Sequence, residues 1–322
     1  MPASTAIDPS LVERFKAALD RLNPEGGKIG LAVSGGPDSM AMLLLAHEAI
    51  LGGFEVATVD HGLRPEAKDE CALVVAACEE RSVPCEVLSV EVGEGNVQAK
   101  AREARYAALD DWAVTKYTAI ATAHHADDQV ETLIMRLNRG SGLRGLAGVW
   151  ETGETGLWNI PVIRPLLRFR RLELQGVVEQ AGIVYADDPS NEDDRFERVR
   201  IRKLLQNAAW IDPVSWAQSA SHLAEAEDAL RMALLDVWSE YVTMSAENIQ
   251  LRDRGPRELT RRLAEQCISR LGGEARGSDL SAMLKKLRVG DQGNVGGILI
   301  RREYGVTETV LIFRPEPPRR SG

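Results

Sequence analysis

The stretch Ile29–Ala46 reads IGLAVSGGPDSMAMLLLA, and it decides the fold. Its first residues, Ile29–Val33, form a short apolar run of the kind found in buried strands. A polar turn with two glycines, Ser34–Ser39, follows, and apolar residues then recur at helical spacing over residues 38–51. This change of period predicts a strand that passes through a tight turn into a helix.

The same alternation continues along the chain. Strand-like runs and helical patterns follow one another in the order Phe54–Val59 (strand), Glu66–Arg81 (helix), Cys85–Val90 (strand), Asn96–Thr115 (helix), Ala119–Ala123 (strand) and Asp127–Asn138 (helix). Strands that alternate with helices form a parallel sheet covered on both faces. The predicted fold class is therefore α/β with a doubly wound parallel sheet. Ligands of such sheets bind beyond the carboxyl ends of the strands.

The last third of the chain has a different pattern. Pro213–Met244 and Pro256–Leu271 are predicted to be helices, and Gly293–Phe313 contains two strand-like runs around Tyr304. We therefore expect a boundary near residues 205–220. The predicted domains are residues 1–212 and a second, smaller, mostly helical C-terminal domain over residues 213–322.

Composition bounds the class of protein. The chain has 322 residues, 44% of them hydrophobic and 27% charged, which is typical of a soluble globular protein. Its first residues lack the apolar core of a secretory signal, and no apolar run is long enough to span a bilayer. The four cysteines form no C-x-x-C pair, so we expect reduced, mostly buried thiols in a cytoplasmic protein without a membrane partner. These cysteines are Cys71, Cys78, Cys85 and Cys267.

The turn SGGPDS at Ser34–Ser39 has the chemistry of a phosphate-binding loop. Glycines let the backbone approach an anion, and the following helix presents N–H groups, to which Ser34 and Ser39 add hydroxyls. The turn lacks the lysine of a Walker A loop, and it matches neither G-x-G-x-x-G nor G-x-S-x-G. A carboxylate beside a polyphosphate needs a cation between them, which makes Asp38 a candidate Mg²⁺ ligand. The alternative is a plain turn in which Ser34 or Asp38 caps the helix.

A second polar segment, AHHADDQVET at Ala123–Thr132, starts at the end of a predicted strand and enters a helix. A carboxylate in the first turn of a helix is favoured by the helix dipole. Capping accounts for one of the acids Asp127 and Asp128. It does not account for both together with His124 and His125, so this segment is predicted to be functional.

These two segments resemble a known family. Ser34–Ser39 matches S-G-G-x-D-S, the signature of the PP-loop, or N-type ATP pyrophosphatase, superfamily, and His124–Thr132 resembles the H-H-x-D-D-Q-x-E-T signature of the tRNA(Ile)-lysidine synthetase family within it. Further stretches continue the likeness in order: Val59–Arg64, the pairs Ala101–Arg102 and Arg105–Tyr106, Arg139–Gly142, Arg164–Leu167 and Asp188–Asn191. One position departs, because Val199 stands where the family often has asparagine in R-N-x-I-R.

The resemblance implies a reaction and its participants. ATP, with Mg²⁺, would adenylate the wobble cytidine of a tRNA(Ile) with a CAU anticodon, and free L-lysine would then displace AMP from C2 to give lysidine. The implied phosphate-binding residues are Ser34, Gly35, Gly36, Pro37, Asp38 and Ser39. Asp38 with Asp128 would hold Mg²⁺, and His124 with Arg105, or alternatively Arg102, would contact the activated intermediate. The oligomeric state stays open, and a homodimer is compatible with the sequence.

The net charge of −9 argues mildly against a nucleic-acid partner, but the cations are clustered. Arginine binds phosphate bidentately, so a cluster after residue 194 is predicted to bind tRNA: Arg195, Arg198, Arg200, Arg202 and Lys203. A solvated surface is the alternative interpretation. Further candidates in the C-terminal domain, predicted to grip the tRNA, are Arg261, Arg262, Lys285, Lys286, Arg288, Arg301 and Arg302.

Three other functions remain open at this point. A tRNA-thiolating PP-loop enzyme would need reactive cysteines or a cluster, and the cysteine spacing shows neither arrangement. A PP-loop enzyme that amidates a small molecule leaves the basic clusters unexplained. A nucleotide-binding regulatory module leaves the paired acids and histidines unexplained.

Overall fold

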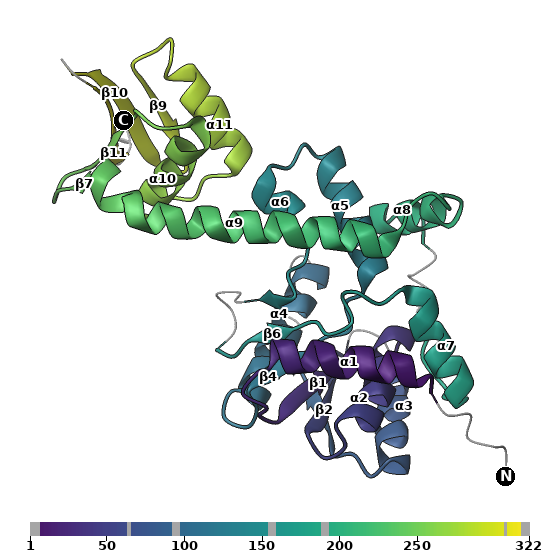
Figure 1. Cartoon of the computed structure of the whole chain (residues 1–322). Helices are drawn as coiled ribbons and strands as arrows, with labels where there is room; N and C mark the ends of the chain where they lie inside the picture. Colours follow the sequence, from purple (N-terminus) through teal and green to yellow (C-terminus); the bar gives the residue numbers. More distant parts are fainter. Residues whose placement is uncertain are drawn as a thin grey trace. The chain divides into compact units, whose positions relative to one another are not determined.

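The computed structural model describes residues 7–62, 66–91, 97–153, 159–187, 193–305 and 308–316 (Figure 1). The chain divides into two compact units, Met1–Glu225 and Ala226–Gly322. The boundary falls inside one long helix, α9 (Pro213–Tyr241). We call the two parts unit 1 and unit 2.

Unit 1 is built on a six-stranded sheet with the order β3-β2-β1-β4-β6-β5. All neighbours are parallel except β5 and β6, which are antiparallel. The strands are β1 (Ile29–Ala32), β2 (Phe54–Asp60), β3 (Cys85–Ser89), β4 (Ala119–Ala121), β5 (Thr152–Gly153) and β6 (Val162–Ile163). Since β2 and β3 lie on one side of β1 and β4 on the other, the strand order reverses between β1 and β4. Doubly wound sheets bind ligands at such a switch point.

Helices cover both faces of this sheet. One core joins β1 to α1, α2, α3 and α7, while a second core packs α4 against the other face through Leu109 and Trp112. The predicted doubly wound α/β fold is therefore confirmed. The helices of unit 1 are α1 (Pro9–Leu22), α2 (Pro37–Ala49), α3 (Glu66–Glu80), α4 (Val97–Ala113), α5 (Ala126–Asn138), α6 (Leu143–Leu146), α7 (Arg171–Ala181) and α8 (Glu197–Gln206).

Unit 2 combines helices with a five-stranded antiparallel sheet of order β7-β8-β11-β10-β9. Its core includes Leu263 and Cys267 of α10 and Phe313 of β11. Besides the end of α9, the described elements are β7 (Val242–Met244), β8 (Ile249–Arg252), α10 (Arg257–Arg270), α11 (Gly277–Lys286), β9 (Gln292–Val295), β10 (Ile298–Tyr304) and β11 (Thr309–Pro315).

One predicted boundary is wrong in unit 2. The helix expected to reach Met244 ends at Tyr241, and the next three residues form β7. Val242 and Thr243 are β-branched and pair with β8 in an antiparallel register, so the sheet overrides the helical pattern at this end.

Candidate active site

The loop between β1 and α2 is held in shape by its own side chains. The backbone N–H of Ser34 donates to Ser39 Oγ at 3.1 Å, and the Ser39 hydroxyl donates to the Gly36 carbonyl at 3.0 Å. Gly35 has φ +85°, and an added Cβ would lie 3.1 Å from the carbonyl oxygen of Glu70. The first glycine of the pair is therefore required by the backbone.

The start of α2 is open toward a ligand. Gly36 is the N-cap and supplies no side-chain hydrogen bond to the first turn of the helix. The first N–H groups of a helix lack partners within it and carry a partial positive charge. This arrangement is suited to a phosphate group.

Across the switch point, β4 leads into α5, and His125 is the N-cap of that helix. The His125 ring is buried, and its Nε2 lies 3.5 Å from Asp38 Oδ2 and 3.6 Å from Asp128 Oδ2. The two acids that the sequence singled out therefore approach the same ring nitrogen, one from α2 and one from α5. Asp127 has a structural role instead, because its carboxylate accepts a hydrogen bond from the backbone N–H of Arg171 at 2.8 Å and so links α5 to α7.

The two histidines have opposite electrostatic properties. Burial acts to lower the pKa of His125, but the nearby carboxylates of Asp128, Asp38 and Asp127 outweigh it and raise this pKa to about 9. Burial lowers the pKa of His124 to about 4, against the attraction of Asp128. At neutral pH His125 is therefore a cation between acids, whereas His124 is a neutral ring.

Asp38, His124, Asp127 and Asp128 line one large cleft of 1480 Å³. This volume exceeds the roughly 300–1,000 Å³ of common small-molecule sites, so it can accommodate more than a nucleotide. Sequence-predicted residues that line it are Ser34, Gly36, Pro37, Asp38, Ser39, Arg102, Arg105, His124, Asp128, Arg198, Arg202 and Lys203. The structure thus brings the loop, the acidic pair and the two arginines of α4 to one place.

The residues of the predicted tRNA-binding cluster, most of which lie on α8, do not all face the cleft. Arg198, Arg202 and Lys203 line the cleft, whereas Arg195 lies outside it with 86% of its side chain exposed and pairs with Asp193. Arg200 is also exposed and donates to the backbone carbonyl of Asp194 at 2.7 Å.

Glu131 is a residue of the cleft to which the sequence gave no role. Its carboxylate is buried and accepts a hydrogen bond from Arg202 at 2.7 Å, and Arg198 Nε lies 3.3 Å away. Although burial opposes it, the pairing with Glu131 raises the pKa of Arg202. The sequence did contain one indication of this ion-pair cluster: Arg198 and Arg202 are four residues apart on a predicted helical segment, and residues at this spacing share a helix face.

The cysteines are mostly buried, as predicted: Cys71, Cys78 and Cys267 are buried and Cys85 partly so. Burial raises the pKa of Cys267 to about 12, and burial also raises that of Cys71. Residues 63–64 of the stretch Val59–Arg64 and all of residues 188–191 lie outside the described residues.

A Mg²⁺ ion fits the donors at the switch point. Asp38 Oδ1 is buried and has no hydrogen-bond partner among the described residues, so this carboxylate oxygen remains available to a cation. Mg²⁺ in nucleotide sites uses one or two carboxylates and takes its other ligands from phosphates and water.

Comparison with known proteins agrees with this geometry. The model of the PP-loop domain family matches residues 8–209, so unit 1 contains a PP-loop domain. A tRNA(Ile)-lysidine synthase from Novosphingobium aromaticivorans is 47% identical over 291 residues, which cover 88% of this chain and 89% of that protein. A second, from Zymomonas mobilis, is 38% identical over 92% of this chain and 91% of its own length. The chain belongs to the tRNA(Ile)-lysidine synthase family.

Solved structures support the fold alone. The U34-tRNA thiolase NcsA from Methanococcus maripaludis, solved with its [4Fe-4S] cluster, aligns with a TM-score of 0.54 at 19% identity and covers 68% of this chain and 81% of that one. Within the part of the chain that the structure describes, no helix has the length and apolar character needed to cross a bilayer.

Proposed function

We propose that this chain joins free L-lysine to C2 of the wobble cytidine of a CAU-anticodon tRNA(Ile), with ATP converted to AMP and pyrophosphate. The observation that carries the proposal is the approach of Asp38 and Asp128 to one nitrogen of His125, beside a glycine loop at a helix N-terminus. The lysidine synthases that resemble the chain over most of its length support the same reaction.

In the first step, O2 of the cytidine attacks the α-phosphorus of ATP, and the bond to pyrophosphate breaks. The loop N–H groups at Gly36 and the start of α2 hold the triphosphate. Asp38 and Asp128 would hold Mg²⁺, which neutralises phosphate charge when bound. Arg105 of α4 and His124 line the same cleft and would contact the adenylated base.

In the second step, the neutral ε-amine of lysine attacks C2. The C2–O2 bond breaks, AMP leaves with that oxygen, and the nitrogen loses its extra proton. The reaction needs no nucleophile from the protein, so catalysis consists of alignment and charge stabilisation. The size of the cleft supports this scheme, because lysine, base and nucleotide must be present together.

The RNA would be held by cations of both predicted domains. Arg198, Arg202 and Lys203 line the cleft and would act near the anticodon, while Arg195 and Arg200 are exposed and would contact phosphates outside it. Residues 213–322 would form the tRNA-binding domain and residues 1–212 the catalytic one. We further propose that the protein acts in the cytoplasm, on its tRNA substrate.

The test is an incubation of the protein with ATP, Mg²⁺, labelled lysine and a tRNA(Ile) transcript. We expect AMP, pyrophosphate and a cytidine whose mass has increased by that of one lysine minus one water, and no product from a matched transcript whose wobble base is uridine. Release of ADP and phosphate would refute the mechanism. Modification that requires a sulfur donor instead of lysine would assign the chain to the thiolating enzymes.

A further inference from the structure

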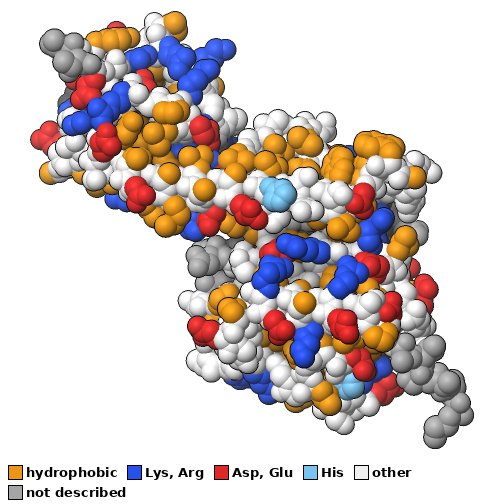
Figure 2. Space-filling model, viewed as in Figure 1, with side chains coloured by type: hydrophobic (Ala, Val, Ile, Leu, Met, Phe, Trp, Pro, Cys, Tyr) orange, Lys and Arg blue, Asp and Glu red, His pale blue; other side chains and the backbone are white. Residues whose placement is uncertain are grey.

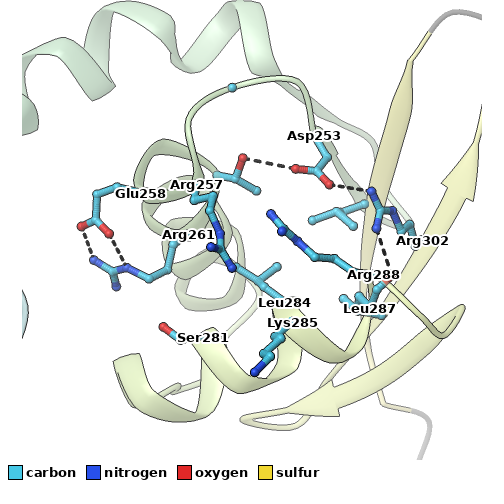
Figure 3. Close-up of a pocket in the computed structure, with 13 residues that line it drawn as sticks. Asp253, Arg257, Glu258, Arg261, Ser281, Leu284, Lys285, Leu287, Arg288 and Arg302 are labelled. Carbon is cyan, nitrogen blue, oxygen red and sulfur yellow. Dashed lines mark hydrogen bonds and ion pairs between the residues drawn. The ribbon is translucent and has the colours of Figure 1, made fainter. Parts of the chain in front are cut away.

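Unit 2 contains a cavity of its own, between the start of α10 and the end of α11 (Figure 3). Its volume is 250 Å³, and β10 and β11 close it through Arg302 and Leu311. Figure 2 shows Lys and Arg side chains gathered on this unit around α11.

The walls of this cavity are basic although the chain as a whole is acidic. Two acidic residues, Asp253 and Glu258, line it together with five cationic residues. The excess of positive charge favours an anion as its ligand. The cations are Arg257, Arg261, Lys285, Arg288 and Arg302.

Two of these cations already neutralise the acids. Arg261 donates to both oxygens of Glu258, at 2.6 and 2.9 Å. Arg302 donates to Asp253 and to the carbonyl of Leu287, each at 3.1 Å. The Nε of Arg302 is also buried and has no hydrogen-bond partner among the described residues, so one donor at the wall remains unused.

The other three cations have no partner among the described residues. The side chains of Arg257, Lys285 and Arg288 make no hydrogen bond or ion pair with any residue in the described ranges. Figure 3 shows Arg257 and Arg288 extending toward the middle of the cavity. Cations that gather without counterions repel one another, and an anion between them would remove that repulsion.

The backbone at the start of α10 adds to the positive electrostatic potential of the cavity. Helix α10 starts at Arg257, and its N-cap, Pro256, supplies no side-chain hydrogen bond. The N–H groups of its first turn have no partner within the helix, and the positive end of the helix dipole lies at Arg257. Free N–H groups beside arginine and lysine are the usual surroundings of a bound phosphate.

We propose that this cavity binds one phosphate of an RNA backbone. Its volume is below the range of sites for drug-sized ligands and is sufficient for a single phosphate group. Arg257, Lys285 and Arg288 are exposed, so a phosphate held by them can remain part of a polymer that passes over the surface. The inference rests on the proposed function for the identity of the RNA, a tRNA.

The test compares two full-length variants with the same change of charge. In the pocket variant, Arg257, Lys285 and Arg288 are each replaced by Gln. In the control, Arg231, Arg276 and Arg314 are replaced by Gln; these are exposed residues of the same unit that do not line the cavity. Circular dichroism and thermal unfolding would check that both variants are folded.

Binding of a tRNA(Ile) transcript is then measured by fluorescence anisotropy at several salt concentrations. We expect the Kd of the pocket variant to rise at least about tenfold, and the slope of log Kd against log salt to fall by about one, as for the loss of a phosphate contact. The control should bind within about threefold of wild type, since long-range charge alone is screened. Equal weakening of both variants, or wild-type affinity in the pocket variant, would overturn the proposal.

A second arm separates RNA from free phosphate. Inorganic phosphate is titrated into both variants and wild type and followed by ³¹P line broadening. If broadening is lost only in the pocket variant while tRNA affinity is unchanged, the cavity binds free anions and the RNA assignment is wrong. Failure of wild type to incorporate lysine would instead refute the proposed function, and the anisotropy data would still decide the pocket.

Discussion

The two glycines of the SGGPDS loop should respond differently to a single methyl group. At Gly35 a side chain in the left-handed region costs about 1–2 kcal/mol, and its Cβ would also press on the Glu70 carbonyl at 3.1 Å. The substitution also lowers the conformational entropy of the unfolded chain, which offsets about 0.4–1 kcal/mol of this cost. Gly35→Ala should therefore destabilise unit 1 by about 1–2 kcal/mol, given the added contact with Glu70.

Gly36 is the matched control. It has no positive φ, and the nearest atom to an added Cβ is Ser34 Oγ at 3.9 Å, so Gly36→Ala should leave stability unchanged or slightly raised. Gly36 lines the cleft, however, and an added methyl would occupy the proposed phosphate site. The dissociation constant of the Gly36→Ala variant for ATP should rise about tenfold or more, because overpacking costs roughly 1–3 kcal/mol.

Thermal unfolding and ATP titration calorimetry measure the two effects separately. For a unit of this size, 1 kcal/mol corresponds to roughly 2–4 °C in Tm, so Gly35→Ala should unfold about 2–8 °C below wild type. Equal Tm losses in the two variants, or unchanged ATP binding by Gly36→Ala, would refute the assignment of one glycine to the backbone and the other to the ligand.

Three further predictions follow from ion pairs. Glu131→Gln should slow tRNA-dependent lysine incorporation by about tenfold, because Arg202 loses a charge-assisted hydrogen bond worth roughly 1.5–3 kcal/mol. Glu131→Asp keeps the charge and should restore part of the rate. A wild-type rate for Glu131→Gln in a kinetic assay would contradict a role for this ion pair. Glu227→Ala should destabilise unit 2 by about 3 kcal/mol in denaturant unfolding, since it leaves the buried Arg262 short of its partner, and a change below about 1 kcal/mol would contradict this. Hydrogen bonds from Arg261 and Arg262 lower the pKa of Glu258 to about 2, although partial burial opposes them. Because this folded-state pKa lies below the unfolded value of 4.5, the ionised carboxylate stabilises the fold above pH 4.5, and this stabilisation is lost as the pH falls toward 2. The difference in Tm between wild type and Glu258→Gln should therefore shrink from pH 6 to pH 2.5, and a constant difference would contradict this prediction.

Most of the fold of unit 1 could be predicted because its strands and helices differ in period. The strand–turn–helix at Ile29–Ala46 was located within two residues, and the ends of β1 and β4 were placed at one sheet edge. Very short strands such as β5 and β6, two residues each, carry no period of their own and were not predicted. The end of α9 was misplaced because pairing with β8, a distant segment, decides it.

The site could be predicted as a set of residues but not as an arrangement. Sequence reasoning paired Asp38 with Asp128, yet it gave no role to His125, which the structure places between them. Which of two adjacent histidines turns inward depends on how β4 enters α5, and only the packing of both elements sets that. The arginine cluster was treated as one surface, whereas α8 directs Arg198 and Arg202 into the cleft and Arg200 away from it.

A crystal structure with Mg²⁺ and α,β-methylene ATP, whose α–β bond resists cleavage, tests the central claim most directly. We predict carboxylate oxygens of both Asp38 and Asp128 at about 2.1 Å from one Mg²⁺ that also contacts the triphosphate, with the phosphates against Gly36 and the start of α2. A triphosphate bound away from this loop, or either carboxylate turned away from the metal, would contradict the account.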